Sequence, residues 1–111
     1  MPIQIKKDGA TAVVSLSGKL DGVTGPEYQK TMRELIETGS SRVVVDLGEL
    51  NYISSAGLGE LITTAKLLKQ KDGQFCVANV HGAVLSVFEI CRMGSLLNIY
   101  DSVADALATL P

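Results

Sequence analysis

Three consecutive valines, Val43 to Val45, are the feature that most restricts the fold of this chain. β-Branched residues favour extended backbone, and neighbouring side chains of a strand point to opposite faces of its sheet. A strand that is apolar on both faces is typical of the middle of a sheet that has parallel neighbours and is covered on both sides. We therefore expect this segment to be the central strand of a sheet packed against helices.

Helical periodicity predicts four helices. The first begins with residues 24–27 (TGPE), which we interpret as a capping box, and ends at Gly39. The others start near residues 55, 82 and 102, and a break at residues 72–73 ends the second. The apolar positions expected to be buried on these helices are Tyr28, Met32, Leu35, Ile36, Leu58, Leu61, Ile62, Ala65, Leu68, Val84, Val87, Phe88, Cys91, Val103, Ala106, Leu107 and Leu110.

Extended segments alternate with these helices. Residues 3–7 and 12–17 flank an Asp-Gly turn and predict a hairpin, and residues 74–78 and 97–100 predict two further strands. The order ββαβαβαβα indicates an α/β fold with a mixed sheet of about five strands and about four helices, packed mainly on one side. No repeat or linker divides the chain, so we expect residues 1–111 to form one domain.

Composition excludes several classes of protein. Apolar residues make up 46% of the chain, which excludes a disordered polymer, and a net charge of −2 with scattered basic residues argues against nucleic acid as a partner. No signal peptide or run of about 18 apolar residues is present, so we expect a cytoplasmic protein without membrane contact, and a monomer. Cys76 and Cys91 are expected to be buried, reduced thiols that form neither a disulfide nor a zinc site. His81 is expected in a loop or at a helix cap.

The segment from Asp46 to Gly59 is the least ordinary part of the sequence. We interpret its beginning as a polar loop, with Asp46 ending the valine strand. The loop leads into a predicted helix whose first turn contains Gly57 and Gly59, although glycine inside a helix costs about 1 kcal/mol relative to alanine. The two glycines indicate that a neighbouring backbone or a partner approaches closely.

Ser54 and Ser55 stand where this helix begins. The simplest interpretation is that one of them caps the helix through its hydroxyl. The small residues around them also leave a hydroxyl accessible to a modifying enzyme, and the free amides and positive dipole of a helix N-terminus accommodate a phosphate. A P-loop is excluded because no Gly-Lys-Ser/Thr follows the glycines, and a hydrolase is a weaker interpretation because His81 is the sole histidine and no G-x-S-x-G motif occurs.

Two carboxylates follow predicted strands. Asp21 comes after the second strand and Asp46 ends the third, so both are expected at the same edge of the sheet as Ser55. Capping of loop amides is the simpler interpretation for each of them. Neither carboxylate has the spacing of a metal ligand.

Residues 18–21 (GKLD), 46–47 (DL) and 52–59 (YISSAGLG) together resemble the signature of STAS domains, specifically of the small bacterial anti-sigma factor antagonists. Residues 88–105 resemble the C-terminal part of that fold, so the resemblance spans nearly the whole chain. It implies a protein that is not an enzyme and needs no cofactor. Such an antagonist binds an anti-sigma factor that is itself a serine kinase, and thereby frees a sigma factor.

The resemblance also implies how the protein is switched. Phosphorylation of one serine by the kinase releases the antagonist, and a metal-dependent serine phosphatase restores it. The family motif places the phosphorylated residue at Ser55, with Ser54 as the second choice. The family pattern has Asp before this serine and Ser or Thr after it, whereas this chain has Ser54 and Ala56, which leaves the preference of the kinase open. The residues expected to line the partner site are Asp21, Asp46, Ser54, Ala56, Gly57, Leu58 and Gly59.

Two other functions are compatible with the sequence. A STAS module that is not phosphorylated would bind a nucleotide or another regulatory protein, and nucleotide binding at the Ser55 end of the helix would distinguish it. A small hydrolase using Ser55 would require an inhibitor-reactive serine and a base.

Overall fold

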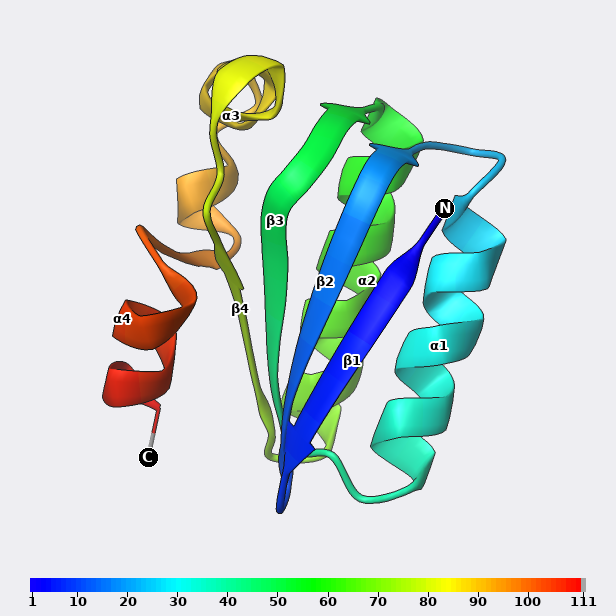
Figure 1. The fold of residues 1–111 in the computed structure, drawn as a ribbon, viewed down its shortest axis with the longest axis vertical. Coiled ribbons are helices and arrows are strands. Elements are labelled where there is room, and N and C mark those ends of the chain that lie inside the picture. The colour runs from blue at the N-terminus through cyan, green and yellow to red at the C-terminus, as the bar shows by residue number, and fades with distance from the viewer. Residues whose placement is uncertain (111) are drawn as a thin grey trace.

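A five-stranded mixed sheet organises the chain in a computed structural model, which describes residues 1–110. Its strands are β1 (Ile3–Asp8), β2 (Thr11–Leu20), β3 (Arg42–Ile53), β4 (Gln74–Ala78) and β5 (Asn98–Tyr100), and they lie side by side in sequence order. β1 and β2 form the expected antiparallel hairpin, and all later pairs are parallel. The valine strand is central, as predicted, because β3 has two strands on each side (Figure 1).

β3 is much longer than the sequence suggested. We expected a polar loop after the valines, with Asp46 as the end of the strand, and this was wrong: β3 continues to Ile53, and Asp46 pairs with Ser15 and Ala78. The strand continues because the β2–β3 pairing shifts register at two places, as in a β-bulge. These shifts keep β3 paired with β2 while Leu47 and Ile53 stay buried. Asp46 therefore lies within the sheet and not at its edge.

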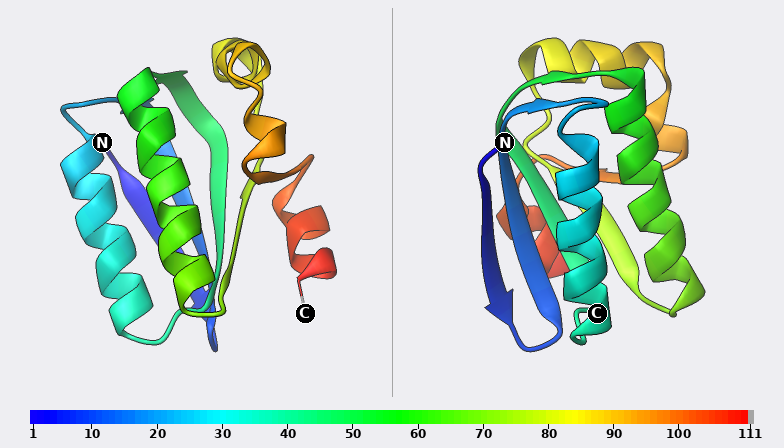
Figure 2. Two further views of the ribbon diagram at one scale, coloured as in Figure 1. Left: turned by 180° about the vertical axis from the view of Figure 1, so that it is seen from behind. Right: turned by 90° about the vertical axis from the view of Figure 1, so that its right-hand side faces the viewer.

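Two long helices cover one face of the sheet. They are α1 (Gly25–Glu37) and α2 (Ser55–Gln70), which run side by side in Figure 2. The predicted apolar stripes are confirmed in their main positions, since Tyr28, Met32, Leu61 and Leu68 are buried. The sequence stripe missed Thr64, whose buried hydroxyl lies 2.9 Å from the hydroxyl of Tyr28 and joins the two helices.

The remaining helices are α3 (Gly82–Ile90), the short 3₁₀ turn η1 (Met93–Ser95) and α4 (Val103–Thr109). α3 adds Val84 and Phe88 to the main core. α4 packs on the opposite face over a smaller core, which includes Val44, Cys76 and Ala106. The helices thus lie mainly, but not wholly, on one side of the sheet (Figures 1 and 2).

Two buried positions were predicted incorrectly. Leu107 is 43% exposed, because it lies on the side of α4 that extends beyond the small core. Cys91 is exposed because α3 ends at Ile90 and Cys91 only caps it. Cys76 is buried as expected, and burial raises the pKa of its thiol to about 11.

The two ends of the sheet differ in what they carry. The carboxyl ends of β2 and β3 lead into α1 and α2 at one end, while the β1–β2 turn and the connections from α1 to β3 and from α2 to β4 lie at the other (Figure 1). Within residues 1–110 no helix combines the length and apolar character that crossing a membrane requires.

Candidate functional site

The ends of β2 and β3 meet at the N-terminus of α2. The backbone N–H of Ser54, the residue after β3, donates to the carbonyl oxygen of Leu20, the last residue of β2, at 3.0 Å. This bond fixes the loop between β2 and α1 beside the first turn of α2. We call the surface formed by Asp21–Thr24 and Ser54–Ala56 the candidate site.

Ser54 and Ser55 divide two tasks between them. Ser54 is half-buried and is the N-cap of α2, since its hydroxyl accepts a hydrogen bond of 3.1 Å from the backbone N–H of Gly57. Ser55 is the first residue of the helix and is exposed, and its hydroxyl makes no hydrogen bond to any described residue. The capping interpretation is therefore confirmed for Ser54, while the hydroxyl of Ser55 is free.

Replacing Ser54 with alanine is expected to lower the free energy of unfolding by about 1 kcal/mol, because the amide of Gly57 loses its acceptor. Urea denaturation measures this change. The matched variant Ser55→Ala should leave stability within about 0.5 kcal/mol of the original chain, since it removes an exposed group without a partner. Equal losses in the two variants would contradict this division of tasks.

The two glycines of the first turn have different surroundings. Gly57 is buried, and a Cβ built there would overlap the carbonyl oxygen of Leu20 and lie 2.8 Å from Cγ1 of Ile53. The predicted close approach of a neighbouring backbone is confirmed at this position. A Cβ at Gly59 meets nothing within 4 Å, so the packing of this chain gives no reason for glycine there. Ala56, like Ser55, is exposed, and Leu58 is buried.

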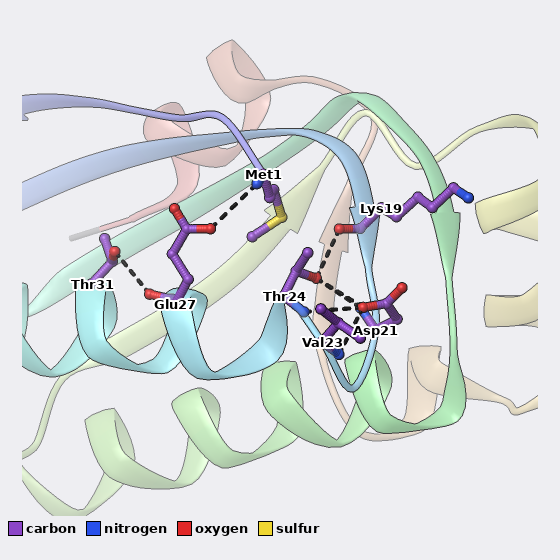
Figure 3. Close-up of polar contacts among 7 residues, drawn as sticks. All are labelled: Met1, Lys19, Asp21, Val23, Thr24, Glu27 and Thr31. Atoms are coloured by element: carbon purple, nitrogen blue, oxygen red, sulfur yellow. Dashed lines mark hydrogen bonds and ion pairs between the residues drawn. The ribbon is translucent and has the colours of Figure 1, made fainter.

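Asp21 organises the loop between β2 and α1 (Figure 3). Its Oδ1 accepts hydrogen bonds from the backbone N–H groups of Val23, at 2.9 Å, and Thr24, at 3.0 Å. In return, the N–H of Asp21 donates to the hydroxyl of Thr24, which itself donates to the carbonyl oxygen of Lys19. We call this closed set of bonds the Asp21 clasp, and it confirms the loop-capping interpretation of Asp21.

The capping box predicted at the start of α1 was wrong. The Thr24 hydroxyl is occupied by the Asp21 clasp and makes no cap bond to the helix. Glu27 instead receives a hydrogen bond of 3.3 Å from the N-terminal amine of Met1 (Figure 3). The residue types suited the motif, but the Thr24 hydroxyl bonds within its own loop and the Glu27 carboxylate bonds to the N-terminus.

The Asp21 clasp also sets the charge of the site. Hydrogen bonds from the amides of Thr24 and Val23 stabilise the ionised carboxylate and hold the pKa of Asp21 below its ordinary value of 3.8. The positive charge of Lys19 acts in the same direction. Asp21 is therefore a permanent anion at neutral pH.

Because the folded state lowers this pKa, the charge of Asp21 stabilises the fold fully above pH 3.8, and the contribution is lost as pH falls through the lower, folded value. We expect the stability difference between the original chain and Asp21→Asn to be constant near neutral pH and to shrink in strong acid. Urea denaturation at a series of pH values measures it. A difference that does not change with pH would show that the charge contributes nothing.

The same loop presents a residue that the sequence analysis missed. Val23 is 88% exposed at the tip of the loop, although its backbone is held by the Asp21 clasp. The available signal was a valine next to Gly22 in a short loop, one position before the N-cap residue Thr24. The candidate site therefore combines a free hydroxyl, a hydrogen-bonded carboxylate and an exposed apolar side chain on a restrained backbone.

Asp46 does not join this site. It lines a different cavity, of about 640 Å³, between the β1–β3 face and α4, together with Ser15 and Val103. Its Oδ1 accepts from the N–H of Gly48 and the side-chain amide of Asn79, both at 2.9 Å. Of the two predicted carboxylates, only Asp21 belongs to the loop that follows Leu20, the residue bonded to Ser54 at the start of α2.

His81 lies in the connection between β4 and α3. It is the N-cap residue of α3 by position, but its side chain makes no cap bond. Its Nε2 lies 2.7 Å from the carbonyl oxygen of Gly48, so it links the β4–α3 connection to β3. The expectation of a loop or capping histidine is confirmed.

Comparisons with known proteins identify the family of this chain. The family model of the STAS domain matches residues 2–106. BtrV of Bordetella bronchiseptica is 31% identical over 108 residues, 97% of this chain and 93% of that protein, and the anti-sigma F factor antagonist of Paenibacillus polymyxa is 29% identical over 99% of this chain and 95% of its own. The Bacillus cell fate determinant SpoIIAA, solved in its phosphorylated form, has the same fold, with a TM-score of 0.73 at 16% identity over 96% of this chain and 97% of that one. This chain belongs to the STAS domain family.

Proposed function

We propose that this chain is an anti-sigma factor antagonist that binds an anti-sigma factor serine kinase through the candidate site and is released when Ser55 is phosphorylated. The observation that carries the proposal is the exposed, unpartnered hydroxyl of Ser55 on the first residue of α2. Relatives that cover nearly the whole chain support it, because one of them is named an anti-sigma F factor antagonist. A solved phosphorylated form of a structural neighbour gives independent support.

The position of Ser55 suits a phosphate. A phosphoserine carries a charge of about −1.5 to −2, and the unpaired amides and positive dipole of a helix N-terminus stabilise such an anion. Ser54 is the poorer acceptor, because its hydroxyl is half-buried and already bonded to the amide of Gly57. Phosphorylation of Ser55 therefore leaves the fold of the antagonist intact.

The switch acts at the surface. If Ser55 lies within the contact with the kinase, its phosphate places an uncompensated dianion in that contact, next to the permanent charge of Asp21. The complex then dissociates, and a metal-dependent serine phosphatase returns the antagonist to its binding form. All three proteins act in the cytoplasm in this scheme.

Mass spectrometry tests the proposal. The purified chain is incubated with ATP and, one by one, with the anti-sigma factor kinases of its own organism, and the phosphorylated residue is located in peptides. We expect a single phosphate on Ser55, and none on Ser55→Ala. An unmodified chain with every kinase, or a phosphate on Ser54 alone, would favour a STAS module that binds a nucleotide or another regulatory protein without this switch.

A further inference from the structure

Val23 is an apolar side chain that the fold holds in water. It is 88% exposed, whereas the valines of the sheet core, such as Val43 and Val45, are completely buried. A single exposed apolar residue is ordinary on a protein surface, and Ile90 on α3 is 81% exposed, so the case for Val23 depends on its position. Val23 lies in a four-residue connection, and its side chain contributes little to the packing of this chain.

The backbone around Val23 is unusually well fixed for such a loop. The Asp21 clasp engages the N–H groups of Asp21, Val23 and Thr24, and the next N–H, of Gly25, donates to the carbonyl oxygen of Asp21 at 2.8 Å. The backbone N–H group of every residue in the four-residue loop except Gly22 is therefore hydrogen-bonded, which restrains the position of Val23. A side chain on a restrained backbone loses little conformational entropy when a partner covers it.

The position of the loop links Val23 to Ser55. Leu20, which directly precedes the loop, accepts the hydrogen bond from Ser54 and contacts the first turn of α2 at Gly57. Gly25, which directly follows the loop, lies against the side chain of Glu60 in the second turn of α2. Both ends of the loop that carries Val23 therefore pack against the first two turns of α2, the helix that begins at Ser55.

We infer that Val23 is the apolar anchor by which the anti-sigma factor kinase recognises this antagonist, and that it inserts into a small aliphatic pocket of the kinase beside the active site that phosphorylates Ser55. This inference rests on the proposed function. Val23 is a positioning residue, because it touches the kinase and not the reacting hydroxyl. Its contact holds the start of α2 in place while the γ-phosphoryl group of ATP is transferred to the Ser55 oxygen, ADP leaves as its bond to that group breaks, and the serine proton passes to a base of the kinase.

Replacing Val23 with alanine tests the inference. Removing the two methyl groups should raise the dissociation constant of the complex about tenfold and raise the KM for phosphorylation of Ser55 by a similar factor, while kcat stays unchanged. Val23→Ile, which keeps the branched side chain, should bind with an affinity close to that of the original chain. Thermal unfolding of both variants should match that of the original chain, because an 88% exposed side chain supports little of the core.

Leu107→Ala is the matched control. It also removes exposed apolar surface, but from α4 on the opposite face of the sheet, and it should change neither KM nor the dissociation constant. Unchanged KM and affinity in Val23→Ala, with Ser55 still phosphorylated, would overturn the inference and leave the proposed function standing. A lower kcat with an unchanged KM would also overturn it, and a chain that binds none of the kinases would overturn both.

Discussion

Replacing Ser55 with aspartate is expected to weaken binding to the anti-sigma factor kinase by about 100-fold to 4,000-fold. An unpaired charge buried in a contact costs about 3 to 5 kcal/mol, and each 1.4 kcal/mol changes the dissociation constant tenfold. The aspartate would lie on the exposed first residue of α2, where the dipole of the helix stabilises it in the free protein. The loss therefore falls on the complex and not on the fold.

Titration calorimetry with the purified kinase measures this loss. Ser55→Ala is the control, because it removes only a hydroxyl without a partner and should bind with an affinity within a few-fold of that of the original chain. Because this variant has no hydroxyl at position 55, phosphorylation cannot release it from the kinase. Ser55→Asp should also unfold at the same urea concentration as the original chain or a higher one. Full binding by Ser55→Asp would exclude Ser55 from the contact and with it the proposed switch.

The largest loss of stability is expected from Gly57→Ala. A methyl group at this buried position overlaps the carbonyl oxygen of Leu20 and crowds Cγ1 of Ile53 at 2.8 Å, and neither neighbour is the free end of a flexible side chain. Forcing α2 away from β2 should lower the free energy of unfolding by about 3 kcal/mol, near the upper end of the usual cost of overpacking. Partial separation of α2 would also break the bond from Ser54 to Leu20.

Gly59→Ala provides the comparison within the same helical turn. Its Cβ has open space, and alanine favours a helix over glycine by about 1 kcal/mol, so this variant should be equal in stability to the original chain or more stable. Chemical denaturation of the two variants side by side separates the effect of close packing from that of helix propensity. If the Gly57→Ala protein were as stable as Gly59→Ala, the result would show that Leu20 and Ile53 can move aside without lowering the free energy of unfolding.

The order of helices and strands could be read from the sequence because each element follows one periodic pattern. The alternation in β2 and the stripe of α1 from Tyr28 to Leu35 describe burial correctly, since one face of each meets the core. The sequence pattern did not predict the part of β3 beyond Asp46. Its second half carries Gly48, Glu49 and Asn51, which are poor strand formers, and only pairing with β2 across register shifts keeps them extended.

The candidate site was predictable only where local chemistry decides the geometry. The N-cap at Ser54 and the need for a small residue at Gly57 follow from the helix itself and from its close approach to β2. The roles of Thr24 and Asp46 do not, because the hydroxyl of Thr24 bonds within the β2–α1 loop and the carboxylate of Asp46 bonds to Asn79 from another strand end. The exposure of Val23 depends on hydrogen bonds within the same loop, which no periodic pattern of the sequence describes.

The unequal ends of the sheet bear on how such a protein can vary. Every feature assigned to partner recognition lies where β2 and β3 finish, whereas the connections at the opposite end are short turns, such as the one at Gly9 and the one at Asp72, that take part in none of it. Lengthening those turns, or joining another domain there, would leave the recognition surface in place. The fold thus separates the end of the sheet that binds partners from the opposite end, where the chain can accept insertions or further domains. This separation suits a domain that occurs in proteins of different architecture.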